Sequence, residues 1–389
     1  MSAPAAAPFA AAFAEGDPST LAARCLAQLP NTEGATLGIL YVSEPTALVL
    51  PLIARELAAG TGISSWVGGV GLGVSAPGHE VYENHAAVVM TLPLPPDRFR
   101  LFGATDDPAA DLPRHHASWI DAVSPSLALV HGDPRCENLL RATVDAAAAS
   151  GAFLVGGLMS HRGAEPLLAG QVTTAKGGGP QGTVNPLGKA GIAGLMLAPE
   201  IAVATGLTQG CTPIGPVHRI DEARDNVIMA IDGRPALAVF YEDIGPALAK
   251  DPRGLGGLIF AGLPVAGSDT GDYLVRNLMA IDPRQGWVVL GAEVAPGDQI
   301  LFCRRDPESA RTDMSRMLRQ LAGRLPGPPK AGVYVSCIGR GAALFGDKGV
   351  ETAMIRETLG DFPLIGFFAN GEISRDRLYG HTGVLTLFT

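Results

Sequence analysis

The chain has 389 residues, enough for two or more domains that each bury a core. It is 47% hydrophobic and 17% charged, which excludes a disordered chain. Its net charge of −9 comes without any clustered Lys and Arg, so nucleic acid and anionic membrane surfaces are excluded as partners.

The five cysteines are scattered and keep no CxxC or metal-ligand spacing. Such usage is typical of a reducing compartment, where thiols serve as small apolar residues. No charged signal-peptide start and no apolar run of about 18 residues is present. We therefore expect a cytoplasmic protein that needs no metal and no cofactor.

Elements can be assigned from the N-terminus onward. Residues 1–17 are expected to be a flexible Ala/Pro tail, followed by a helix over 18–29. A strand is predicted over 35–42, and then a helix that runs to residue 59 with Pro51 in its first turn. A Gly-rich strand region (63–78) and an apolar strand (82–94) follow.

The same order returns twice. A strand over 127–130 runs into Asp133, the predicted N-cap of a helix that Gly151 ends. Another strand over 331–337 precedes a helix that is predicted to open at Asp347 and to end at Gly360. In each copy, the helix is followed by a second strand, a polar loop region and a third, apolar strand.

The pattern predicts an α/β protein in the broad sense (mixed α+β). Its mixed β-sheets are expected to form layers that helices cover. Its building block is an internally repeated strand–helix–strand–strand unit. Between the second and third copies the pattern changes: Asp232-Gly233 indicates a hairpin turn and Pro235 the start of a helix. We therefore expect a tail and helix (1–34), an N-terminal domain (35–230) and a C-terminal domain (231–389).

Two strand ends of the third copy carry the candidate ligand-binding residues. The first end brings Cys337 and then Arg340 between Gly339 and Gly341, so that a guanidinium fork and accessible backbone N–H groups could hold a carboxylate. The second end brings Asn370-Gly371-Glu372, in which the carboxylate could bind an ammonium group. The structural alternative is that Arg340 pairs with Glu372, or caps carbonyl groups within the core.

Two cysteines adjoin Gly-rich turns, namely Cys337 and Cys211, which follows Gln209-Gly210. A nucleophilic thiol would need a base and a lowered pKa, and no spacing links either one to a histidine. The sequence favours inert thiols and a non-enzymatic protein with no catalytic residue. A Cys-dependent hydrolase or transferase, and a protein-interaction subunit, remain the alternatives.

Residues 207–240 contain Gln209-Gly210-Cys211, Pro213 to Pro216 and Asp232-Gly233-x-Pro235-Ala236. This run resembles the join between the two halves of FIST proteins, and 336–341, 344–346, 366–373 and 381–388 resemble the C-terminal half of that family. The resemblance covers about residues 35–389.

The resemblance implies a bacterial sensory module for signal transduction that binds a small molecule such as an amino acid. It adds Gln209 and Cys211 to the candidate ligand-binding residues. Only about 34 residues precede the match, too few for the F-box of eukaryotic relatives. The expectation is therefore a stand-alone binder, with a separate signalling protein as a possible partner.

Overall fold

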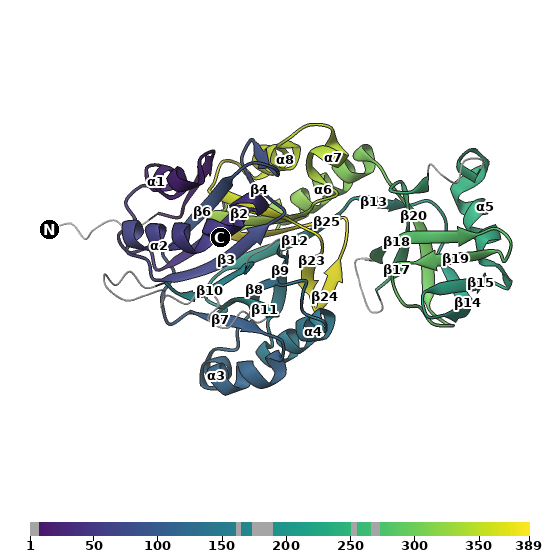
Figure 1. Ribbon diagram of the computed structural model, residues 1–389, viewed down its shortest axis with the longest axis horizontal. Coiled ribbons are helices and arrows are strands. Elements are labelled where there is room, and N and C mark those ends of the chain that lie inside the picture. Colours follow the sequence, from purple (N-terminus) through teal and green to yellow (C-terminus); the bar gives the residue numbers. More distant parts are fainter. Residues whose placement is uncertain (1–7, 161–164, 173–189, 250–254, 266–272) are drawn as a thin grey trace. The chain divides into compact units, whose positions relative to one another are not determined.

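The structure is a computed structural model, and it describes residues 8–160, 165–172, 190–249, 255–265 and 273–389. The chain forms two compact units (Figure 1). Unit 2 consists of Thr208–Ser315 and Tyr379–His381, and unit 1 of the remaining segments. The predicted domain boundary at residue 230 falls inside a strand of unit 2, and the chain from Arg316 belongs largely to unit 1.

Unit 1 contains the repeated unit three times. Each repeat has a first strand that pairs in parallel with its second strand and antiparallel with its third. The first repeat is β2 (Leu37–Ser43), α2 (Leu50–Thr61), β3 (Ser65–Gly71) and β6 (Ala86–Leu92). The second is β8 (Leu127–Gly132), α4 (Leu139–Ser150), β9 (Phe153–Leu158) and β11 (Ile192–Leu197). The third is β21 (Ala331–Cys337), α8 (Val350–Leu359), β22 (Leu364–Ala369) and β25 (Thr382–Phe388).

The repeats exchange strands in a cycle. After its second strand, each repeat supplies a further strand that pairs antiparallel with the second strand of another repeat. The first repeat supplies β4 (Gly73–Ala76) to β22, the second supplies β10 (Leu167–Gln171) to β3, and the third supplies β23 (Glu372–Arg375) to β9. Three mixed sheets of five, six and six strands result.

These sheets have one face toward a shared core and the other toward helices. Side chains that alternate along the strands divide accordingly. Ile39, Leu129 and Val335 meet in one buried cluster drawn from all three repeats, whereas Leu40 packs with Leu57 of α2 in another. The predicted architecture of mixed sheets covered by helices and built from repeats is confirmed.

Residues 10–15 differ from the predicted flexible tail, because β1 (Ala10–Glu15) pairs antiparallel with β6. Residues 1–7 of the predicted tail lie outside the described residues. The three inward side chains of β1 are alanines, which fit closely against the sheet. Gln28 binds the outer edge of β1: Phe13 N donates to its Oε1 (3.2 Å) and its Nε2 donates to Phe13 O (2.6 Å). The predicted helix over 18–29 is present as η1 (Pro18–Thr20) and the short α1 (Leu21–Leu26).

Two predicted helix starts are wrong by a few residues. Helix α4 begins at Leu139 and not beside Asp133, because the buried Asp133 carboxylate binds the backbone N–H and guanidinium of Arg135. Helix α8 begins at Val350 and not at Asp347, since Gly349 has a left-handed φ of 76°. Both predicted helix ends, Gly151 and Gly360, are confirmed.

Several further elements of unit 1 extend these sheets or cover them. The strands are β5 (His79–Val81), β7 (Phe99–Thr105), β12 (Val203–Gln209) and β24 (Arg377–Tyr379), and the last two of these end in unit 2. The helices are η2 (Glu44–Val49), α3 (Pro108–Val123), α6 (Pro307–Ala322, which starts in unit 2) and α7 (Gly341–Phe345). No helix in the described part of the chain is both long enough and apolar enough to span a membrane.

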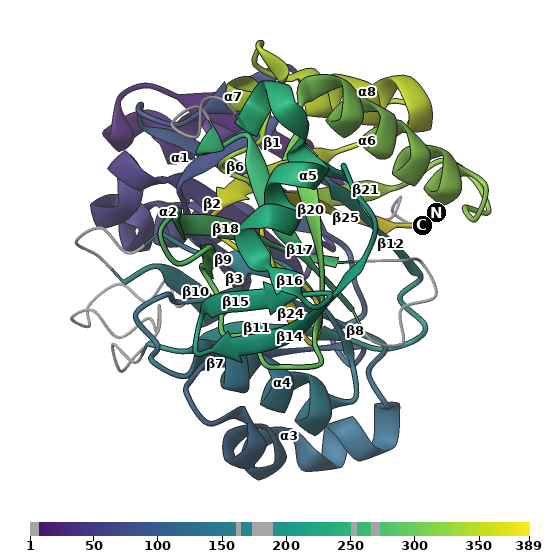
Figure 2. The same cartoon turned by 90° about the vertical axis from the view of Figure 1, so that its right-hand side faces the viewer.

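Unit 2 is a sheet whose strand order closes on itself where β17 pairs with β20. Helix α5 (Ala236–Ala249) packs on this sheet (Figure 2). The predicted hairpin turn at Asp232-Gly233 is confirmed, with left-handed φ at both residues. Its strands are β13 (Cys211–Pro213), β14 (His218–Arg224), β15 (Val227–Ile231), β16 (Arg234–Pro235), β17 (Ile259–Pro264), β18 (Tyr273–Asp282), β19 (Trp287–Leu290) and β20 (Gln299–Arg305).

Candidate functional site

Arg340 stands at the carboxyl end of β21, where the backbone turns into α7. Its side chain is fully buried, and both Nε and Nη2 lie 2.8 Å from Oε1 of Glu351 on α8. Burial by itself would lower the pKa of Arg340, but the charge of Glu351 outweighs it and the pKa is raised. Arg340 therefore carries a permanent positive charge inside unit 1, and its ion-pair partner is Glu351, not the Glu372 that the structural alternative named.

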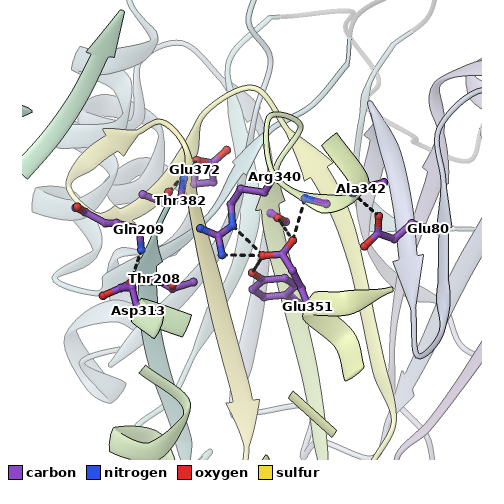
Figure 3. A network of polar contacts seen from close by, with 12 residues as sticks. Glu80, Thr208, Gln209, Asp313, Arg340, Ala342, Glu351, Glu372 and Thr382 are labelled. Carbon is purple, nitrogen blue, oxygen red and sulfur yellow. Dashed lines mark hydrogen bonds and ion pairs between the residues drawn. The ribbon is translucent and has the colours of Figure 1, made fainter. Parts of the chain in front are cut away.

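Glu351 is held by donors from the whole strand end (Figure 3). Tyr334 Oη (2.6 Å) and Ser336 Oγ (2.8 Å) donate to it from β21, and Gly341 N donates from the turn (3.3 Å). The Glu351 carboxylate thus binds the guanidinium of Arg340 and a backbone N–H, the two groups that were predicted to bind the carboxylate of a ligand. The turn is an anion site whose anion is part of the chain.

A second buried acid, Glu80, closes the other side of the turn. Its Oε2 accepts hydrogen bonds from Ala342 N (3.2 Å) and from the hydroxyl of Tyr82 (2.7 Å). Burial raises the pKa of Glu80. Gly341 has φ +51°, and a Cβ there would lie 2.3 Å from Tyr82 Oη, so the residue between the two acids must be glycine.

The second predicted strand end lies at β23. Glu372 is fully buried, and its Oε2 accepts hydrogen bonds from Thr382 N (3.1 Å) and Thr382 Oγ1 (2.8 Å). Burial raises the pKa of Glu372 to about 7, against these bonds and the charge on Arg340. Glu372 and Arg340 therefore do lie within electrostatic reach of each other (Figure 3).

The other predicted residues of unit 1 surround these two. Cys337 ends β21 and is 5% exposed, Gly339 is half-buried in the turn, and Asn370 is exposed. Gly371 is buried with φ 138°, and a Cβ on it would meet Leu158.

A cavity of about 480 Å³ opens beside the turn. One wall is the segment Val81–Asn84, which follows β5, and the other is made by Ile338, Ala342, Ala343 and Lys348. Lys348 and Glu83, both exposed, give the lining one charge of each sign. The hydrogen bonds of Glu80 and Glu351 hold the backbone of the second wall, at Ala342 and at the adjoining Gly341.

Gln209 and Cys211 belong to unit 2. Gln209 N donates to Asp313 (2.7 Å), its Nε2 donates to Tyr273 O (2.9 Å), and Cys211 is 4% exposed. The thiol of Cys211 lies against Cys303, which together with burial raises the pKa of Cys303. Their ligand-binding role stays a prediction.

None of the five cysteines, which are all buried, forms a disulfide. A nucleophilic Cys337 or Cys211 would first have to be exposed to a substrate. In the described part of the chain, no three His, Cys, Asp or Glu side chains are placed to hold a metal ion.

The sequence predicted the charged turn but not its partners. Glu351 lies 11 residues beyond Arg340 in a helix, and Glu80 comes from the first repeat. One signal in the sequence could have indicated a buried acid. Tyr334 and Ser336 occupy alternate positions of the strand that leads into Arg340, and buried polar groups on one strand face need a hydrogen-bond partner.

Several relatives resemble part of the chain. An uncharacterised protein of Mycobacterium tuberculosis is 35% identical over 209 residues, 51% of this chain and 54% of that protein. Another, of Mycobacterium bovis, is 34% identical over 210 residues, 51% and 53% of the two chains. F-box only protein 22 of Homo sapiens is 36% identical over 79 residues, 20% of each. The matches to the mycobacterial proteins thus span about half of their length.

Two domain families match nearly the whole chain. The FIST N domain matches residues 36–234 and the FIST C domain matches 236–375. This order is the one that the motifs around Gln209 and Asp232 had indicated. The chain belongs to the FIST family.

Proposed function

We propose that this protein is a sensor that binds a small zwitterionic molecule, an amino acid or a close analogue, in the cavity between 81–84 and 338–348. It acts without catalysis, in the cytoplasm, and passes its signal to a separate protein. The observation that carries the proposal is the cavity itself, which has opposite charges on its lining and one wall whose backbone is held by buried acids.

The size and the chemistry of the cavity suit such a ligand. Its volume lies within the range of about 300–1,000 Å³ that is usual for small-molecule sites. The ammonium of Lys348 would pair with the ligand carboxylate and the carboxylate of Glu83 with the ligand ammonium.

Arg340 and Gly341 have a positioning role in this proposal. Arg340 fixes Glu351, which accepts a hydrogen bond from Gly341 N, and the turn thereby keeps its shape. Five cysteines without a disulfide support a reducing compartment, and the family membership supports a binding module.

Calorimetric titration with the twenty common amino acids tests the proposal. At least one should bind, and Lys348→Met and Glu83→Gln should each weaken it about tenfold or more, since a hydrogen bond to a charged group contributes about 1.5–3 kcal/mol. Lys330→Met and Glu33→Gln remove exposed charges that do not line the cavity, and should leave the affinity unchanged. If no amino acid binds, or if all four variants bind alike, the proposal is wrong.

A further inference from the structure

Arg340 lies between two buried carboxylates and is bonded to only one of them. Glu351 accepts from Nε and pairs with Nη2, while Nη1 is buried and has no hydrogen-bond partner among the described residues. Glu372 is the second carboxylate whose charge acts on the guanidinium. A buried guanidinium N–H without a partner is costly, so a charged Glu372 would compete for it.

Two titratable or charged side chains near Glu372 in the chain contact aromatic rings: the His381 ring packs on Phe260 (ring centroids 4.4 Å apart) and Arg375 lies over the Phe153 ring. Thr382 and the backbone N–H of Gly371 donate to Glu372, and β9, its partner strand, places Gly157 opposite. Glu351 is the ion-pair partner of Arg340. His131, at the end of β8, is kept neutral near pH 7 because burial lowers its pKa to about 3. Among the described residues, Arg340 is the buried cation whose charge acts on Glu372.

We propose that Glu372 is a proton-dependent switch that controls the turn 338–341 through Arg340. With Glu372 protonated, the guanidinium stays on Glu351 and the turn keeps its conformation. When Glu372 loses its proton, the carboxylates of Glu372 and Glu351 compete for Arg340. The ion pair between Arg340 and Glu351 and the hydrogen bond from Gly341 N to Glu351 then weaken, and the turn becomes more mobile. As that turn forms one wall of the cavity, the inference adds a regulation to the proposed function, and its physiological meaning rests on that function.

The burial of Glu372 sets the pH at which the switch operates. Its pKa of about 7 places the change between about pH 6 and pH 8, with the closed turn on the acid side. Such a position would let the cavity respond to ordinary changes in intracellular pH.

Alkylation of Cys337 measures the turn without any ligand, because Cys337 lies at its start and Arg340 N donates to Cys337 O. Iodoacetamide labelling, read by peptide mass spectrometry, is compared between the wild type and Glu372→Gln over pH 5.5 to 8.5. The ratio of the wild-type rate to the Glu372→Gln rate removes the pH dependence of thiol ionisation that the two proteins share. We expect a ratio near one at the acid end and a rise of about threefold or more above pH 7.

Cys25 is the internal control, since it is fully buried in the outer core of the first repeat and should keep a ratio near one. A flat ratio for Cys337, or an equal rise at both cysteines, would overturn the switch.

If Glu372→Gln does not fold, amide hydrogen exchange of residues 338–345 in the wild type replaces the labelling experiment. Protection, corrected for the intrinsic pH effect, should then fall about threefold across the same range, and constant protection would refute the idea. Failure of every amino acid to bind leaves these readings unaffected and refutes only the proposed function.

Discussion

Glu351 has the chemical environment of a bound ligand carboxylate. It receives a guanidinium, two hydroxyl groups and a backbone N–H, all inside unit 1. Removing two charges from water is expensive, and good geometry with additional hydrogen bonds is what offsets that cost. The pair therefore contributes more to the conformation of the turn than to net stability.

Replacing either partner should be strongly destabilising. Arg340→Met leaves a buried carboxylate without its cation, and Glu351→Gln leaves a buried guanidinium without its anion. Each should lower the free energy of unfolding by about 3–5 kcal/mol, as measured by urea denaturation. The double variant should lose clearly less than the sum, because no uncompensated charge remains.

The i,i+4 pair of the exposed Arg141 with the half-buried Asp145 on α4 gives the control. Arg141→Met should leave the denaturation midpoint unchanged, because solvent screens that pair. Additive losses for the buried pair would contradict the coupling that its geometry indicates.

Sequence patterns located the turn because Gly-Arg-Gly after an apolar strand is a local signal. They could not assign the partner of Arg340, because the nearest carboxylate in space is set by how α8 packs on β21. The same holds for Glu80, which reaches Ala342 from 262 residues away. Residue types at strand ends were predictable, and the pairing between repeats was not.

At the scale of elements, one glycine in each repeat explains how its first two strands pair. Gly68, Gly156 and Gly366 lie opposite Leu40, Val130 and Tyr334 in the parallel ladders. A Cβ on them would stand 1.9, 1.8 and 2.2 Å from the carbonyl oxygen of that partner. The second strand can approach the first only where a side chain is missing, which is why the Gly-rich second strand recurs.

Gly156→Ala should therefore disrupt the β8–β9 pairing. A methyl group would meet Val130 O, and the positive φ of 146° adds strain, so we expect a loss of about 3 kcal/mol or more in the free energy of unfolding. Gly103→Ala, on the exposed side of β7, meets no atom within 4 Å and should be neutral or slightly stabilising. Equal effects of the two substitutions in thermal denaturation would show that the close approach is not what selects glycine.

The repeats were predictable from period and composition, whereas the exchange of β4, β10 and β23 was not. Each of these strands pairs with a strand of another repeat, and such non-local pairing leaves no mark in a local pattern. The strand β1 was missed for a similar reason. Its alanines have low strand propensity, and their small size suits a position that only the assembled sheet defines.

At the scale of the whole molecule, the three repeats meet around a polar pair. Tyr41 of the first and His131 of the second follow Leu40 and Val130 in the same register, and their side chains are joined by a hydrogen bond of 2.9 Å. Phe367 of the third repeat packs on both rings. Burial lowers the pKa of His131 to about 3, so the assembled core requires a neutral imidazole.

The pH dependence of stability should then show two opposite limbs. The pKa of His131 falls on folding from 6.5 to about 3, so its contribution is present above pH 6.5 and is lost as the pH falls toward 3. The pKa of Glu372 rises on folding from 4.5 to about 7, so its contribution is present below pH 4.5 and is lost as the pH rises through 7. At about 1.4 kcal/mol per pKa unit, the full spans are about 5 and about 3 kcal/mol.

Urea denaturation at a series of pH values separates the two limbs when each variant is compared with the wild type. Between about pH 4.5 and 6.5 the two slopes oppose each other, and the wild type should change least there. Relative to the wild type, Glu372→Gln should gain stability as the pH rises from 4.5 through 7, whereas His131→Gln should gain as the pH falls from 6.5 toward 3. Any fixed cost of either substitution shifts its whole curve without changing this slope. Parallel curves for a variant and the wild type would mean that the group titrates alike in the folded and unfolded chains, and that its burial does not control its proton.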